Sequence, residues 1–524
     1  METPHSILKK FFGYDSFRPG QEQIVQRLLA GQDVLAVMPT GAGKSICYQV
    51  PALLLPGLTL VISPLISLMK DQVMALQNAG IPAGCIHSAM SVEELREAYR
   101  DTRFGAYKIL YIAPERLLTD GFCALAQELE ISLLAVDEAH CISQWGQDFR
   151  PSYLKILDFL QKLPRRPALA AFTATATAQV RSDIVRILQL QDPVTVVTGF
   201  DRPNLRFEVL RPQDKRRALL ELLEERRDKS GIVYCATRKG VEQICELLQS
   251  SGFAASRYHA GLSPDERRQN QEDFIFDRAQ IMVATNAFGM GIDKPNVRFV
   301  IHYNMPKDLE SYYQEAGRAG RDGEPARCTL LYSGTDVRTI RFFIDKEMEA
   351  DNGLPADVKA EAARKAEERL KYMTFYSTTP RCLRGYLLSY FGEAAPQKCE
   401  NCSNCLLAGQ VAEQVEEQAA QARQRAAASA KRLASAARRR ADEDALSEAD
   451  EKLLAALYAL RKRLAAKQKL PAYMVFNDST LRQMALKKPL SVEELLNIPG
   501  VGEKKAARYG QEFLSVIEDM VSSR

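Results

Sequence analysis

Two successive series of short apolar segments most constrain the fold of this chain. The first consists of VLAVMPT (34–40), LTLVISP (58–64), KILYIAPE (108–115), LLAVDEAH (133–140) and ALAAFTAT (168–175), and the second of GIVYCAT (231–237), AQIMVAT (279–285), VRFVIHYNMP (297–306) and ARCTLLYS (326–333). Each segment has the length and composition of a strand that is buried on both faces. Because longer amphipathic segments separate them, we expect two tandem α/β domains with doubly wound parallel sheets.

With 524 residues, the chain is too long for one hydrophobic core. We expect the two α/β domains at residues 1–203 and 204–345, followed by a helical module at 346–410. Residues 411–445 are rich in Ala, Gln and Arg but poor in aliphatic residues, which predicts a solvated helix or flexible linker. Residues 446–524 regain helical apolar periodicity and predict a small all-α domain.

The overall composition, 46% hydrophobic and 26% charged, is that of an ordinary globular protein. No apolar run approaches the roughly 18 residues that a membrane helix needs, and the N-terminus does not resemble a signal peptide. We therefore expect a cytoplasmic or nuclear protein without membrane contact. The formal net charge of +4 permits local basic patches for nucleic acid but does not require them.

The segment MPTGAGKS (38–45) ends the first predicted strand and begins a helix, as a phosphate-binding loop does. Thr40, Gly41 and Gly43 would let backbone amides approach the phosphates of ATP. Lys44 would reach the β- and γ-phosphates and Ser45 would hold Mg²⁺. The segment departs from the strict G-x-x-x-x-G-K-[ST] pattern, because Met38 replaces its first glycine.

A second motif, DEAH (137–140), also follows an apolar strand. Asp137 suits a magnesium-binding carboxylate and Glu138 suits the base that polarises the attacking water. Hydrolysis also needs cations near the γ-phosphate, and QEAGRAGRDG (314–323) supplies Arg318 and Arg321 three residues apart, on one face of an expected helix. Because these arginines belong to the second α/β domain, we expect ATP to bind between the two domains.

Taken together, the motifs resemble those of superfamily-two helicases with RecA-like domains. TGAGKS, DEAH, FTATA (172–176), YHAGL (258–262), ATNAFGMGID (284–293) and QEAGRAGRDG occur in the order of that superfamily. FGYDSFRPGQ (12–21) and CISQWGQDFRP (141–151) resemble the RecQ family specifically. The resemblance covers residues 1–405 and 446–524.

This resemblance implies further residues of the ATP site. Tyr14 would stack on adenine, with Arg18 and Gln21 at its edge. Thr173 and Thr175 would relay between nucleotide and DNA, Asp293 would contact the ribose or the catalytic glutamate, and Arg321 is the preferred arginine finger.

The only tryptophan of the chain, Trp145, lies in a polar segment directly after DEAH. The segment resembles the aromatic-rich loop with which RecQ helicases bind single-stranded DNA. Trp145 and Phe149 would stack on bases, and Arg150 would hold a phosphate or reach the ATP site. Gln147 stands where the family commonly has histidine, and the alternative role for Trp145 is an anchor between domains.

Four cysteines predict a metal site. Cys399, Cys402 and Cys405 form C-x2-C-x2-C, and 16 residues separate Cys382 from Cys399. Four thiolates favour a closed structural Zn²⁺ site, as in the RecQ zinc module. An iron–sulfur cluster is the alternative, but the ferredoxin-type run would place a cysteine at Gly409.

Residues 446–524 resemble the HRDC domain of RecQ and ribonuclease D proteins. In NIPGVGEKKAARYG (497–510), glycines precede Lys504, Lys505 and Arg508, which predicts non-specific contact with DNA phosphates. The alternative is a domain that packs on proteins or on the motor itself. RecQ relatives usually have a winged-helix domain after the zinc module, and residues 406–445 are too few and too polar for one.

The resemblance implies an ATP-dependent helicase that moves 3′ to 5′ on single-stranded DNA and unwinds duplex and forked DNA in repair, recombination and replication. It also implies association with the bacterial nucleoid and, among protein partners, single-strand-binding protein or other repair factors. An RNA-remodelling ATPase is an alternative, since the motor motifs do not distinguish the sugar. A DNA-binding or annealing platform switched by ATP is disfavoured, because the catalytic carboxylate and arginines are present.

Overall fold

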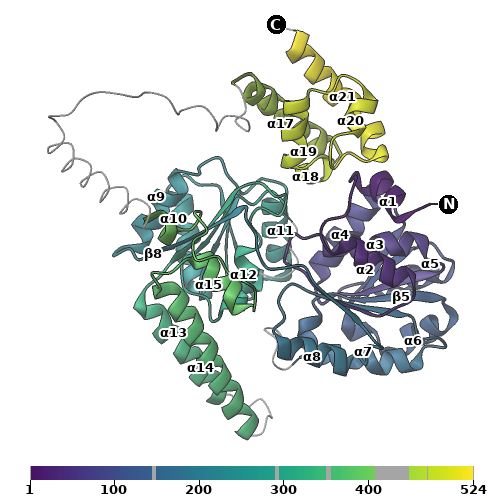
Figure 1. Ribbon diagram of the computed structural model, residues 1–524, viewed down its shortest axis with the longest axis horizontal. Helices are drawn as coiled ribbons and strands as arrows, with labels where there is room; N and C mark the ends of the chain where they lie inside the picture. Colours follow the sequence, from purple (N-terminus) through teal and green to yellow (C-terminus); the bar gives the residue numbers. More distant parts are fainter. Residues whose placement is uncertain are drawn as a thin grey trace, which may run out of the picture.

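Parallel sheets form the centres of two α/β lobes in the computed structural model (Figure 1). The structure describes residues 2–143, 149–288, 294–349, 356–407, 448–468 and 470–522. The two predicted α/β domains and the helical regions that follow them are confirmed.

The first lobe contains a sheet with the strand order β3-β4-β2-β5-β6-β1-β7, all parallel. Its strands are β1 (Val34–Val37), β2 (Leu58–Ile62), β3 (Ala83–Ile86), β4 (Ile109–Ile112), β5 (Ile131–Val136), β6 (Ala168–Thr173) and β7 (Val194–Val197). Its helices are α1 (Pro4–Ile7), η1 (Leu8–Phe12), α2 (Gln21–Leu29), α3 (Lys44–Leu54), α4 (Ile66–Asn78), α5 (Val92–Arg103), η2 (Pro114–Arg116), α6 (Asp120–Glu128), η3 (Ala139–Ile142), α7 (Pro151–Lys162) and α8 (Ala178–Ile187).

The second lobe repeats this plan with the strand order β10-β11-β9-β12-β13-β8. Its strands are β8 (Leu205–Leu210), β9 (Gly231–Tyr234), β10 (Ala255–Tyr258), β11 (Ile281–Ala284), β12 (Phe299–His302) and β13 (Ala326–Leu331). Its helices are α9 (Lys215–Glu224), α10 (Arg238–Ser250), α11 (Pro264–Ile275), η4 (Asn286–Phe288) and α12 (Leu309–Ala316).

Four strands were not among the predicted ones: β3, β7, β8 and β10. All four lie at the edges of the sheets. An edge strand need not be apolar on both faces, and all four of these strands have half-buried or exposed residues: AGCI in β3, VTVV in β7, LRFEVL in β8 and ASRY in β10. A continuous apolar run therefore predicts central strands but not edge strands.

Two helical regions complete the molecule. The first contains α13 (Gly334–Glu349), α14 (Ala356–Thr378) and α15 (Leu383–Tyr390), and the second contains α17 (Glu448–Gln468), α18 (Ala472–Val475), α19 (Asp478–Lys487), α20 (Val492–Leu496) and α21 (Glu503–Ser522). Helix α13 runs through the predicted domain boundary at residue 345, and α13 and α14 form a long hairpin that projects from the second lobe (Figure 1). The predicted linker, residues 411–445, lies outside the described residues.

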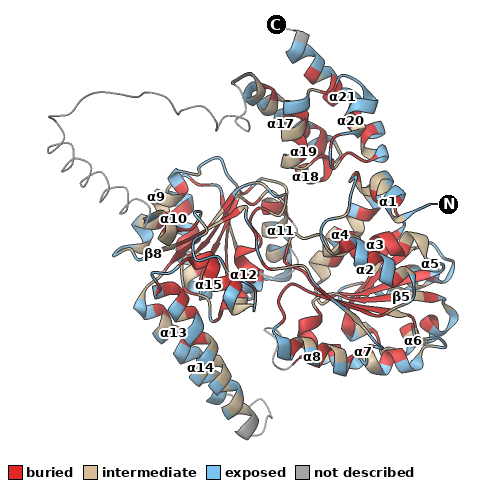
Figure 2. Cartoon of the chain, viewed as in Figure 1, coloured by how far each residue is buried: buried red, intermediate tan, exposed pale blue. Residues whose placement is uncertain are grey.

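Buried side chains are concentrated on the central strands and on the inner faces of the surrounding helices (Figure 2). The last helical region has its own core, in which Leu457, Phe476 and Phe513 are fully buried. Among the described residues, no helix is both long enough and apolar enough to span a membrane.

Candidate active site and metal centre

The predicted ATP-site residues meet at a cavity of about 620 Å³ between the two lobes, which we name the interlobe cavity. Nearly all of the predicted residues line it: Tyr14, Arg18, Gln21, Thr40, Gly41, Gly43, Lys44, Ser45, Asp137, Glu138, Arg318 and Arg321. Asp293 lies outside the described residues. The chain thus gathers groups from positions 14 to 321 around one space large enough for a nucleotide.

The phosphate-binding loop occupies the carboxyl end of β1 and the start of α3, the expected place for a ligand of a parallel sheet. Gly41 and Gly43 adopt φ values of 81° and 79°, in the left-handed region that disfavours side chains. A β-carbon on Gly43 would also lie 2.6 Å from Nε2 of Gln21. The loop therefore needs glycine here to expose its backbone amides.

Arg18 and Gln21 hold this loop from outside. Arg18 Nη1 donates to the carbonyl of Gly41 at 2.6 Å, and Gln21 Nε2 donates to the carbonyls of Ala42 and Gly43 at 2.9 and 3.0 Å. The Gln21 side-chain oxygen in turn accepts from the Arg18 amide at 2.9 Å. Both side chains therefore hydrogen-bond to the backbone of the phosphate-binding loop.

The two carboxylates of DEAH follow β5, as predicted. The backbone amide of Asp137 donates to Ile62 in the neighbouring strand at 2.9 Å, which fixes the position of the residue. Glu138 has a φ of 47°, a left-handed conformation that turns its side chain into the cavity. Burial opposes ionisation of Glu138, but Lys44, His140 and the two arginines outweigh it, so its pKa lies below the ordinary value.

His140 connects Glu138 to the next strand, a role that the sequence did not assign. Its Nδ1 lies 3.3 Å from Glu138 Oε2 and 3.0 Å from Thr173 Oγ1. The Thr173 hydroxyl also donates to the carbonyl of Thr175 at 3.1 Å. The predicted relay residue Thr173 is thus hydrogen-bonded to the histidine of DEAH, and Thr175 is linked to that histidine through Thr173.

Arg318 and Arg321 reach the cavity from the second lobe, but not from a helix. We expected one helical face, and this expectation was wrong: α12 ends at Ala316, and both arginines lie in the turns that follow. The glycines explain the difference, because Gly320 has a φ of 55° and donates to Val297 at 2.9 Å. The Nε atom of Arg318 is buried without a partner among the described residues.

Arg202 joins the two lobes directly at the phosphate-binding loop, and the sequence analysis did not identify it. Its Nη1 donates to the carbonyls of Thr40 (2.5 Å) and Gly317 (3.4 Å), and its Nη2 to those of Ala319 (3.0 Å) and Gly320 (2.8 Å). Thr40 Oγ1 donates to Gly317 at 3.0 Å as well. The residue lies in TGFDRPN, which we interpreted only as a connection rich in turn residues.

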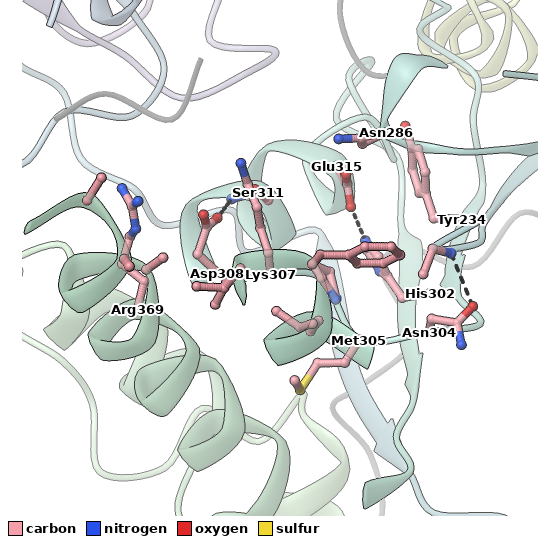
Figure 3. Close-up of a pocket in the computed structure, with 18 of the residues that line it drawn as sticks. Tyr234, Asn286, His302, Asn304, Met305, Lys307, Asp308, Ser311, Glu315 and Arg369 are labelled. Atoms are coloured by element: carbon pink, nitrogen blue, oxygen red, sulfur yellow. Dashed lines mark hydrogen bonds and ion pairs between the residues drawn. The ribbon is translucent and has the colours of Figure 1, made fainter. Parts of the chain in front are cut away.

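A second cavity, of about 600 Å³, lies at the carboxyl ends of strands in the second lobe. We name it the Phe149 cavity, because Phe149 of the first lobe lines it together with α13 and α14. Figure 3 shows Glu315 and His302 paired, with His302 Nε2 and Glu315 Oε2 2.9 Å apart, and Lys307 and Arg369 also line this cavity.

Those of the remaining residues predicted to contact DNA that the structure describes do not lie together in one site. Trp145 lies outside the described residues. Arg150 Nη1 donates to the carbonyl of Pro64 at 3.1 Å. On α21, Arg508 is exposed, Lys504 is exposed with its side chain beside Gly80, and Lys505 lines the interlobe cavity.

The four predicted metal ligands come together at the start of α15. The Sγ atoms of Cys382, Cys399, Cys402 and Cys405 all lie within 4.8 Å of one another. Ligands of one tetrahedral Zn²⁺ would be about 3.8 Å apart, given Zn–S bonds of about 2.3 Å. Backbone amides support the sulfurs, since Gly385 donates to Cys382 and Leu383 to Cys402 at 3.3 and 3.4 Å. This arrangement fits one zinc ion held by thiolates.

The helix that follows Cys382, α15, also contacts the segment that connects the two lobes, residues 200–205. Arg384, between two ligands in the sequence, forms an ion pair with Asp201 and donates to the carbonyls of Arg202 (2.8 Å) and Leu205 (2.5 Å). Phe391 stacks on Phe200 with ring centres 4.5 Å apart. A metal that stabilises this module thereby also stabilises the segment that carries Arg202.

Comparison with protein families agrees with this geometry. The DEAD/DEAH box helicase family matches residues 18–184, and the helicase conserved C-terminal domain matches residues 214–323. The RecQ zinc-binding family matches residues 334–406, and the HRDC domain matches residues 450–517.

Similar proteins cover nearly the whole chain. The ATP-dependent DNA helicase RecQ of Bacillus subtilis is 40% identical, with 99% of both chains covered. The comparison runs over 593 positions, whereas this chain has 524 residues, so the relative contains a substantial insertion. The absence of a winged-helix domain stays a prediction that this difference supports.

Solved structures confirm the fold. The Mycobacterium smegmatis helicase Lhr bound to ssDNA and AMP-PNP has a TM-score of 0.52 at 20% identity, covering 71% of this chain and 57% of that one. The DEAD-box helicase Mss116 bound to ssRNA has a TM-score of 0.54 at 16% identity, covering 67% of this chain and 78% of that one. From the full-length match, the family domains and the assembled motifs, the chain belongs to the RecQ family of ATP-dependent DNA helicases.

Proposed function

We propose that this chain hydrolyses ATP in the interlobe cavity to move 3′ to 5′ along single-stranded DNA and to unwind duplex DNA. The proposal is carried by one observation: the phosphate-binding loop, both DEAH carboxylates and two arginines from the opposite lobe line the same cavity. Repair, recombination and fork processing at the bacterial nucleoid are the proposed setting.

Each group in the cavity has a distinct role. Ser45 and Asp137 would hold Mg²⁺, which would neutralise phosphate charge, while Lys44 binds the β- and γ-phosphates. Glu138, ionised in this environment, orients the attacking water and accepts its proton. Arg318 and Arg321 stabilise the charge that develops on the γ-phosphate.

Coupling to movement follows from the two-lobe arrangement. ATP attracts the arginines of the second lobe towards the loop of the first, and product release removes that attraction. Arg202 is bonded to the backbone on both sides of this junction, so it transmits the change. The lobes then alternate between closed and open arrangements around the DNA strand.

We place the DNA strand across the Phe149 cavity. Phe149 comes from the loop that begins at the DEAH motif, whereas Asn286, Lys307 and Arg369 come from the second lobe and its helical module. Stacking on aromatic rings does not depend on base sequence, and cations hold the phosphates. A strand in this position touches both lobes and senses their relative motion.

Unwinding of a 3′-tailed duplex and a 5′-tailed duplex, with ATP and Mg²⁺, tests the polarity. We expect displacement of the 3′-tailed substrate alone, and none with Lys44→Ala. Preference for the 5′ tail would contradict the proposed polarity, and unchanged displacement by Lys44→Ala would contradict the proposed ATP site.

Trp145→Ala tests the proposed DNA coupling. Loss of base stacking should remove most of the stimulation of ATPase by single-stranded DNA while basal ATPase stays largely intact. Equal loss of both rates would assign Trp145 a structural role.

An RNA-remodelling activity is the second candidate, because the fold also matches the Mss116 structure, which is bound to ssRNA. ATPase rates measured with matched DNA and RNA oligonucleotides separate the two. We expect stimulation by DNA, and stronger stimulation by RNA would favour the second candidate.

A further inference from the structure

The HRDC domain, helices α17 to α21, lies beside the first lobe and the second lobe (Figure 1) and contacts both of them. Its residues Tyr473, Asn477, Ser479, Pro499, Gly500, Gly502 and Lys505 line the interlobe cavity together with the ATP-site residues. The domain therefore forms one wall of the space in which we place the nucleotide.

Backbone contacts join the HRDC domain to the first lobe beside the proposed adenine site. The amide of Gly500 donates to the carbonyl of Gly13 at 3.0 Å, and Lys9 Nζ donates to the carbonyl of Leu496 at 2.6 Å. Gly13 has a φ of 76°, and a β-carbon there would lie 2.6 Å from the backbone of Val501. This close approach directly precedes Tyr14.

Ion pairs join the same domain to the second lobe beside the arginine site. Arg482 lies 3.1 Å from Glu324, and Asp478 lies 3.8 Å from Arg298, which also pairs with Asp322. Asp322 directly follows Arg321 in the sequence. The HRDC domain thus contacts each lobe next to a residue that we propose to bind the nucleotide, Tyr14 in the first lobe and Arg321 in the second.

Lys505 is the cation that this domain contributes to the cavity. It also lines a smaller adjoining pocket with Asp71, Gln72, Asn78 and Tyr473. It forms no hydrogen bond or ion pair with the described residues, and burial lowers its pKa to about 8. A half-buried ammonium group that lines the same cavity as a phosphate-binding loop is suited to an anionic ligand.

We infer that Lys505 of the docked HRDC domain is a nucleotide-binding residue, which contacts the phosphates of the ATP held between the lobes. The inference rests on the proposed ATP site. It assigns the HRDC domain a role in addition to the predicted DNA contact: the domain completes the nucleotide site when it is docked on the lobes. Lys505 binds the nucleotide only when the domain is docked.

The affinity of the full-length chain for a non-hydrolysable ATP analogue, measured without DNA, tests this inference. We expect Lys505→Ala to weaken binding about five- to tenfold, as loss of a charge-assisted hydrogen bond does, and Lys505→Arg to restore most of it. Lys462→Ala, an exposed lysine of the same domain, is the matched control and should bind like the unmodified chain.

The two proposals fail differently in this experiment. Wild-type affinity in Lys505→Ala, with binding lost in Lys44→Ala, would overturn the HRDC inference and leave the ATP site standing. Wild-type affinity in Lys44→Ala would overturn the proposed ATP site itself.

Arg482→Glu separates direct contact from loss of docking. The new carboxylate would face Glu324 and repel the domain from the second lobe. We expect it to weaken the affinity for the analogue, and the double variant with Lys505→Ala to bind no more weakly than the weaker single variant. Fully additive losses would show that the effect of Lys505 does not depend on docking.

Discussion

Arg202 shows how one side chain connects the phosphate-binding loop to the arginine segment of the other lobe. It is 9% exposed and donates to four backbone carbonyls. A guanidinium group suits this task because its donors form a fixed planar fork. Burial lowers the pKa of Arg202, but a guanidinium group is not deprotonated in proteins, so the charge persists.

Arg202→Lys should lower kcat for ATP hydrolysis about tenfold or more and change KM less, because lysine keeps the charge but cannot hold both segments. Steady-state ATPase assays check this. Arg217→Ala is the control, an exposed arginine paired with Glu221, and it should behave like the unmodified chain. An unchanged kcat in Arg202→Lys would show that charge alone suffices.

Glu310 predicts a pH dependence of stability. Burial and the nearby Asp308 raise its pKa from 4.5 to about 7, although the Tyr390 hydroxyl donates to it at 2.7 Å. Between these values the folded chain binds a proton that the unfolded chain has lost, so stability falls as pH rises from 4.5 to about 7 and then levels off.

Glu310→Gln removes this titration. It should increase the free energy of unfolding by about 1–3 kcal/mol at about pH 8, which raises the thermal midpoint there. Near pH 4.5 it should have little effect. Thermal unfolding of both proteins across this range is the measurement. An equal effect at both ends would mean that the substitution acts through packing rather than charge.

At the scale of elements, the start of α15 combines a metal centre with a support for the interlobe connection. Cys382 caps the helix and Arg384 lies in its first turn. Because Arg384 binds the carbonyls of Arg202 and Leu205, folding of this helix affects the segment between the lobes. Zinc bound by these cysteines would therefore affect the active site indirectly, by fixing the position of this segment.

Removal of the metal should unfold this module. We expect about one zinc per chain by elemental analysis, and Cys402→Ser should lose most of it and lower the thermal midpoint. Cys123→Ser is the control, since Cys123 lies apart from the four-cysteine cluster. A brown, iron-containing protein would contradict zinc.

Central strands and active-site loops could be predicted, whereas edge strands and the arginine turn could not. Continuous apolar runs identify strands buried on both faces, such as β1 and β5, and ligand loops follow their carboxyl ends. Edge strand β10 (ASRY) lacks that pattern. Helix α12 ends at Ala316, and the next residue, Gly317, lies so close to Thr40 of the other lobe that a β-carbon there would clash with Thr40 Oγ1, a contact that the local sequence does not contain.

At the scale of the whole molecule, docking of the HRDC domain opposes its proposed use as a DNA-binding domain. Lys504 packs beside Gly80 and Lys505 lines the interlobe cavity, so neither lysine is fully available to DNA in the docked arrangement. ATP binding and DNA contact through these lysines should therefore compete, which links the nucleotide state to the position of the domain.

Arg482→Glu, which weakens docking, should release these lysines. We expect tighter binding of single-stranded DNA without nucleotide, and a steeper salt dependence, by about 0.7 in the log–log slope for each new phosphate contact. Fluorescence anisotropy at several salt concentrations measures both. An unchanged slope would show that the docked lysines do not bind DNA after release.

The sequence by itself determined the two parallel sheets, the phosphate-binding loop, the DEAH carboxylates and the four cysteines, because each depends on a local pattern of apolar or chemically distinctive residues. Only the tertiary structure decided the interlobe role of Arg202, the turn that carries Arg318 and Arg321, and the position of Lys505. These depend on contacts between residues more than a hundred positions apart, such as Gly13 with Gly500 and Arg202 with Gly320. Such contacts are set by how the separately folded parts fit together, and the local residue pattern contains no record of that fit.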